Sequence, residues 1–208
     1  LKDQRSSELQ AAVYKFASEI RESGTLVKET SDGYRLGELF LERRRRPRGQ
    51  IRFTYNREPM HSWVNFSSPK DLKTLHTQSL RRLHSTAIPD ALLKDIFFET
   101  YLSCDELFNK KGWVKIEDFY LPLRKALISS ELSTRANADL SKFASFPNFA
   151  FLYNLDRYQT IRRKIDKSKR LKYETASQLE TGKFGVLLGG LNNHELKKLC
   201  WIVRDISP

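Results

Sequence analysis

Residues 39–55 read LFLERRRRPRGQIRFTY, and this stretch decides how the N-terminal part of the chain is interpreted. Its second half alternates apolar Ile51, Phe53 and Tyr55 with polar neighbours, a period of two that predicts a half-buried strand. The seven residues 43–49 that precede this half hold five arginines, one proline and one glycine. The stretch therefore predicts a β-hairpin whose tip is covered with arginine.

The segments on either side of this hairpin are short and mixed. Between a capping box at Ser7 and Gln10 and a stop at Gly24, apolar side chains recur at spacings of four, three and four, which predicts one amphipathic helix. Residues 25–29 are predicted as a strand that turns at 31–33. Residues 34–42 suit either a helix or a strand, and 56–69 are predicted as a loop. In outline, a helix followed by such a hairpin resembles the tail of a winged-helix module. That module has three helices before its hairpin, whereas only one is predicted here, so the resemblance identifies no family.

The remainder of the chain is predicted to be helical. Apolar residues recur at helical spacing in five segments, at 69–84, 89–108, 119–132, 147–180 and 193–203. The expected fold class is therefore mainly α, a helical bundle-like body with a small N-terminal β-hairpin. We expect two domains, a helix-plus-hairpin module over residues 1–66 and a helical domain over residues 67–208.

The chain is strongly basic. Its 208 residues include 37 Lys and Arg against 25 Asp and Glu, a formal net charge of +12. The excess gathers in two clusters. Residues 35–57 hold eight arginines and no lysine, and residues 157–172 hold eight basic residues against one acid, Asp166. Such clusters favour an anionic partner, and nucleic acid is the partner we expect.

The first cluster is all arginine, and a guanidinium matches phosphate oxygens in a bidentate way and stacks on bases. The predicted phosphate contacts in this element are Arg43, Arg44, Arg45, Arg46, Arg48 and Arg52. The alternatives are a solvated loop without a ligand and a localisation signal.

The second cluster lies on the helix predicted over 147–180. Residues spaced by four and three share a face of a helix, which predicts a second phosphate track there. The residues of this track are Arg162, Arg163, Lys167 and Arg170, and Arg81 and Arg82 are expected to bridge the two clusters. The alternatives are an ordinary solvated face, a calmodulin-type basic segment and a membrane-surface helix.

No pattern in the sequence predicts catalysis, a metal or a cofactor. The four histidines are never three or four residues apart, and no phosphate-binding glycine motif or converging set of carboxylates occurs. Cys104 and Cys200 are predicted to be buried free thiols, which favours a reducing intracellular compartment, cytoplasm or nucleus. No apolar run approaches the roughly 18 residues of a membrane span, so we expect no membrane partner.

These patterns predict a non-catalytic protein that binds DNA or RNA through phosphates, as one subunit of a larger nucleoprotein complex with other protein subunits. Tyr55, Trp63 and Phe66 are candidates for stacking on unpaired bases, although core burial is the commoner fate of such residues. Two alternatives stay open. One is a helical scaffold whose arginine loop docks an acidic protein, and the other is a hydrolase acting on nucleic acid.

Overall fold

The computed structural model describes residues 2–44, 49–66, 68–107, 111–134, 146–175, 185–191 and 196–205. The chain divides into two compact units. The first comprises residues 1–85 and 189–195, and the second comprises residues 86–188 and 196–208. The sequence suggested a boundary after residue 66, whereas the first unit extends to residue 85 because the helix over 69–85 packs into its core.

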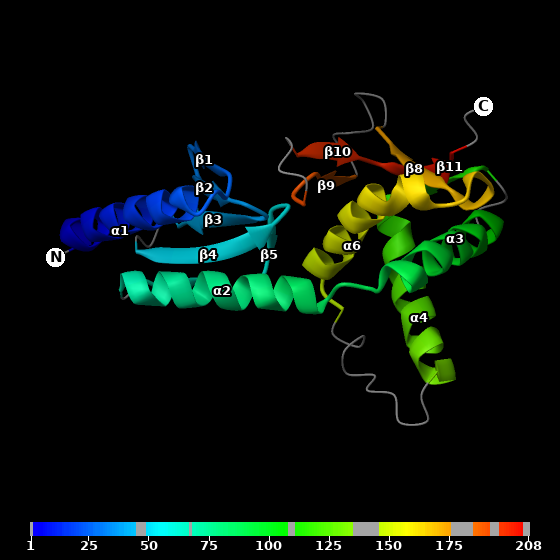
Figure 1. The fold of residues 1–208 in the computed structure, drawn as a ribbon, viewed down its shortest axis with the longest axis horizontal. Helices are drawn as coiled ribbons and strands as arrows, with labels where there is room; N and C mark the ends of the chain where they lie inside the picture. The colour runs from blue at the N-terminus through cyan, green and yellow to red at the C-terminus, as the bar shows by residue number, and fades with distance from the viewer. Residues whose placement is uncertain are drawn as a thin grey trace. The chain divides into compact units, whose positions relative to one another are not determined.

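In the part of the first unit that the structure describes, there are two helices and an antiparallel sheet of six strands (Figure 1). Its elements are α1 (Lys2–Glu22), β1 (Val27–Thr30), β2 (Gly33–Leu36), β3 (Leu39–Arg43), β4 (Gln50–Tyr55), β5 (Glu58–Pro59), β6 (Val64–Asn65) and α2 (Pro69–Ser85). Strands β1 to β5 follow one another in a meander, and β6 joins by pairing with β4. Strands β5 and β6 bind opposite ends of β4.

Alternation along the strands builds the core of this unit. Ile51 and Phe53 are buried on the face of β4 that meets the helices, as the period of two predicts. The His76 ring of α2 lies 5.3 Å from the Phe53 ring and 5.4 Å from the ring of Phe16 on α1 (centroid distances). Both helices therefore cover the same face of the sheet.

The predicted hairpin exists, but as part of a much larger sheet. Strands β3 and β4 pair antiparallel on either side of the arginine run, with Leu41 opposite Phe53 and Arg43 opposite Ile51. The ambiguous residues 34–42 form two strands, which turn at Gly37 with a φ of +61° that favours glycine. The predicted loop 56–69 contributes the two-residue strands β5 and β6, which are too short to give a periodic signal.

The described residues of the second unit form three helices and two small sheets (Figure 1). Its elements are α3 (Asp90–Leu107), β7 (Trp113–Lys115), α4 (Ile116–Thr134), α6 (Asn148–Ile161), the 3₁₀ turns η1 (Arg162–Lys164) and η2 (Lys167–Lys169), β8 (Leu171–Glu174), β9 (Val186–Leu188), β10 (Lys197–Leu199) and β11 (Trp201–Arg204). Strand β11 lies between β7 and β8 in a three-stranded antiparallel sheet, and β9 pairs with β10.

The prediction of a mainly α bundle with one small hairpin is therefore wrong. The expected long helix over 147–180 ends at Ile161, and the expected last helix over 193–203 is replaced by β10 and β11. Ile202 shows why, since it is fully buried between Val114 of β7 and Tyr173 of β8. A short apolar run such as 199–203 fits a buried strand as well as a helix turn, and periodicity alone cannot separate the two.

The winged-helix outline expected at residues 1–66 is also wrong, because the hairpin there belongs to a six-stranded antiparallel sheet. In the second unit, nine of the 14 residues of α6 are buried, so little of this helix is exposed to read base edges.

None of the helices in the part of the chain that the structure describes is long and apolar enough to cross a membrane.

Candidate nucleic-acid interface

The face of the first unit's sheet that the helices leave uncovered is polar near the arginine run. In β4, Gln50 and Arg52 alternate with buried Ile51 and Phe53 and so lie on this outer face. The register sets Glu42 of β3 opposite Arg52 and Asn65 of β6 opposite Gln50. The outer face therefore gathers side chains from three strands at the end of the sheet where β4 begins.

Two of the predicted arginines converge there on an aromatic ring. The guanidinium carbon of Arg52 lies 4.3 Å from the centroid of the Trp63 ring, and that of Arg44 lies 5.7 Å from it. Both distances are within the range of cation–π attraction. Arg44 also donates to the amide oxygen of Gln50 (2.7 Å), and the Gln50 amide donates to that of Asn65 (3.0 Å). These five residues, Arg44, Gln50, Arg52, Trp63 and Asn65, form the Arg–Trp cluster.

The guanidinium groups of the two arginines in the cluster have different partners. The Arg52 Nε donates to the Glu42 carboxylate at 2.6 Å, and both side chains are partly buried. Arg52 is therefore an anchored side chain that supports the Trp63 ring. Arg44 is exposed, and neither Gln50 nor Trp63 neutralises it. Arg44 is the side chain of the cluster that is best placed to meet an anion.

Arg43 does not join the cluster. It pairs with buried Ile51 and so lies on the helix-facing side, where its guanidinium carbon is 5.6 Å from the Tyr34 ring centroid. The Tyr34 hydroxyl donates to Glu29 at 2.7 Å, and burial together with this hydrogen bond raises the pKa of Tyr34. Arg45, Arg46 and Arg48 lie outside the described residues.

Arg81 and Arg82 lie on α2 in the first unit, and both are exposed. The Arg82 guanidinium donates to the Met60 carbonyl, which ties the segment between β5 and β6 to the helix. Arg82 thus has a structural role, and the expected bridge to the second cluster stays a prediction.

The second basic cluster is not one helical face, because α6 ends at Ile161, whereas phosphate binding by its residues stays a prediction. Arg162 pairs with Asp205 at 3.4 Å, and Arg170 donates to the carbonyls of Ile165 (2.8 Å) and Arg163 (3.4 Å). Arg170 therefore holds the segment of the two 3₁₀ turns together, and Arg162 links the first turn to the residue after β11. Two of the predicted contacts stay exposed on those turns, Arg163 and Lys167.

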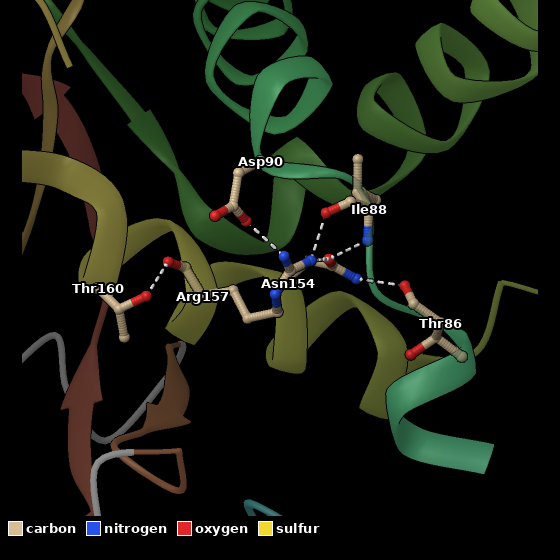
Figure 2. Close-up of polar contacts among 6 residues, drawn as sticks. All are labelled: Thr86, Ile88, Asp90, Asn154, Arg157 and Thr160. Carbon is tan, nitrogen blue, oxygen red and sulfur yellow. Dashed lines mark hydrogen bonds and ion pairs between the residues drawn. The ribbon is translucent and has the colours of Figure 1, made fainter. Parts of the chain in front are cut away.

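A further arginine of this cluster is also structural, as Figure 2 shows. Arg157 donates to the Ile88 carbonyl and pairs with Asp90. Beside it, the fully buried Asn154 accepts from the Ile88 N–H (2.9 Å) and donates to the Thr86 carbonyl (2.9 Å). These contacts attach the segment that precedes α3 to helix α6. They also satisfy the hydrogen-bonding groups of the buried Asn154 amide.

A pocket of about 270 Å³ opens on the other side of β6, between that strand and α2. Its walls combine apolar and polar side chains. The lining residues are Ile51, Val64, Asn65, Phe66, Asp71, Thr74, Leu75 and Gln78. Asn65 belongs both to the pocket lining and to the Arg–Trp cluster, so the two features share strand β6.

No family model, curated protein or solved structure matches this chain. Among the described residues, no group of three or more His, Cys, Asp or Glu is placed to hold a metal ion.

Sequence reasoning missed the Arg–Trp cluster because it predicted the segment with Trp63 as a loop. The two signals available were weak: Trp63 and Asn65 alternate with apolar Val64 and Phe66, as in a strand, and Arg52 lies on the polar face of β4. The pairing of β6 with β4, which brings them together, cannot be read from either segment alone.

Proposed function

We propose that this protein binds nucleic acid without catalysing a reaction on it, and that the Arg–Trp cluster with the adjoining arginine run is the contact surface. The observation that carries the proposal is the approach of Arg44 and Arg52 to Trp63 on the open face of the sheet. Stacked guanidinium and indole groups offer planar surfaces to bases and donors to phosphates.

The sequence that follows Arg44 supports phosphate binding. Arg44 is followed by three further arginines within four residues, so the segment that leaves the cluster is densely positive. Each phosphate that such a cation neutralises releases counterions, which gives affinity that falls steeply with salt.

Little in the second unit supports sequence readout by a helix. Its α6 is mostly buried, and the arginines around it hold the chain together. The proposed binding is therefore charge-driven and tolerant of sequence, as suits a subunit that holds nucleic acid inside a larger assembly with other proteins. Arg163 and Lys167 provide a weaker second contact in this proposal.

The test is fluorescence-anisotropy binding of single-stranded and duplex DNA and RNA at two salt concentrations. The variant replaces Arg44, Arg45, Arg46 and Arg48 with Ala and keeps Arg43 and Arg52, which contact Tyr34 and Glu42. A control removes the same charge elsewhere by replacing exposed Lys15, Arg21, Lys94 and Lys125 with Ala.

The arginine variant should lose at least about tenfold in affinity and show a smaller salt slope, while the control stays within about threefold of wild type. Equal losses in both variants would mean that net charge alone drives binding. Displacement of the oligonucleotide by polyglutamate at matched charge would favour the acidic-protein partner instead. Cleavage of the probe in magnesium would contradict the non-catalytic part of the proposal.

A further inference from the structure

The pocket between β6 and α2 has the size and lining of a site for one small planar group. Its volume of about 270 Å³ lies just below the roughly 300–1,000 Å³ that is usual for sites of drug-sized ligands. Phe66 provides an aromatic wall, and Ile51 and Leu75 provide aliphatic surface. Apolar walls of this kind accept the face of a planar ring.

The same pocket carries polar groups that match the edge of a ring. Asn65 and Gln78 each offer an amide, and Thr74 offers a hydroxyl. One oxygen of the Asp71 carboxylate accepts from the Ser68 hydroxyl at 2.8 Å, and its second oxygen can accept from an exocyclic amine. Donors and acceptors of these kinds read the edges of nucleobases.

Strand β6 connects this pocket to the cations. Asn65 lines the pocket and accepts from Gln50, which in turn accepts from Arg44. An anion held by Arg44 therefore lies one short hydrogen-bonded chain from the pocket. A nucleic-acid strand has the matching arrangement, because each charged phosphate lies beside an uncharged planar base.

We propose that the pocket takes an unpaired nucleobase, so that the preferred ligand is single-stranded nucleic acid. This rests on the proposed function and adds the strand type and the place of the base. A base inside a duplex is stacked and paired on its edge, so it cannot enter the pocket without leaving the helix.

The test blocks the pocket with a substitution on helix α2. Thr74 lines the pocket and is exposed, so Thr74→Trp places a large ring at the mouth of the pocket. Thr77→Trp on the same helix is the matched control, since Thr77 is exposed and does not line the pocket. Both variants are measured by anisotropy against a single strand, the same strand with abasic sites, and a duplex.

Wild type should bind the single strand more tightly than the abasic strand or the duplex. Thr74→Trp should weaken single-strand binding by about five- to a hundredfold and should leave the abasic strand and the duplex unchanged. Thr77→Trp should match wild type throughout.

Equal wild-type affinity for the single strand and the abasic strand would overturn the base pocket, as would equal single-strand affinities of the two Trp variants. Either result leaves phosphate binding by the arginines intact. Absence of wild-type binding to all three probes would instead overturn the proposed function itself, and the base pocket with it.

Discussion

The two basic clusters of this chain hold equal numbers of cations and use them in different ways. In the second unit, Arg157 and Arg170 donate to backbone carbonyls and Arg162 pairs with an aspartate, so these side chains hold turns and segments in place. In the first unit, Arg44 contacts an amide and an indole, both of which leave its charge available. A dense run of charge in a sequence thus indicates candidate binding residues. Only the contacts that each side chain makes in the structure show whether it stabilises the fold or is available to bind a ligand.

The first unit should be the acid-sensitive half of the molecule. His76 is buried between Phe16 and Phe53, and burial lowers its pKa from 6.5 to about 4. The unfolded chain then binds the proton more readily, so stability is full above pH 6.5 and falls as the pH drops toward 4. The loss should reach about 3 kcal/mol of unfolding free energy.

Urea unfolding at pH 7.5 and pH 4.5 measures this loss, and His76→Phe provides the comparison. The variant should remove the part of the pH dependence that His76 causes. An unchanged pH dependence in His76→Phe would show that other groups are responsible.

The second unit should depend most on its buried polar network. Asn154→Leu removes the partners of the Ile88 N–H and the Thr86 carbonyl, and an unsatisfied buried polar group costs roughly 1–3 kcal/mol. We expect a loss of about 2 kcal/mol or more in unfolding free energy, measured by urea denaturation. Asn148→Leu, at an exposed position of the same helix, should change stability by less than about 0.5 kcal/mol. Equal effects at both positions would contradict the role of the network.

Substitutions inside the Arg–Trp cluster should change binding more than folding. Trp63→Ala removes the stacking surface and should weaken single-strand affinity about tenfold, while Trp63→Phe keeps part of the ring and should lose less. Anisotropy titrations measure the affinity, and urea unfolding checks stability. A Trp63→Ala variant that binds like wild type would remove Trp63 from the interface.

The smallest effect should come from the exposed cations of the second unit. Replacing Arg163 and Lys167 with Ala removes two charges that stand on 3₁₀ turns away from any described aromatic partner. Affinity should fall by no more than about threefold, and the salt slope should drop by less than about 1.4. A loss larger than that of the four-arginine variant would reverse the ranking of the two clusters.

Local patterns in the sequence predicted those parts of the structure that depend on neighbours along the chain. The strand at Ile51–Tyr55, its antiparallel partner across the arginine run, and the helices that begin near Pro69 and Pro89 all follow from spacing and turn residues. The helix after Pro147 was also expected, but its end at Ile161 was not.

Features that depend on distant pairing were not predictable in this way. The run at 199–203 became strand because Val114 and Tyr173 flank Ile202. The candidate site followed the same rule: the arginines were visible as a cluster, whereas the approach of Arg52 to Trp63 requires β6 to pair with β4.

Fluorine NMR of protein labelled with 5-fluorotryptophan tests the central claim most directly. The chain has three tryptophans, and Trp113 and Trp201 pack against each other in the second unit, where they serve as internal controls. Single Trp→Phe variants assign the three resonances. Addition of a single-stranded oligonucleotide should shift or broaden the Trp63 resonance in step with binding measured by anisotropy, and leave the other two unchanged. Saturated binding with an unmoved Trp63 resonance would contradict the account.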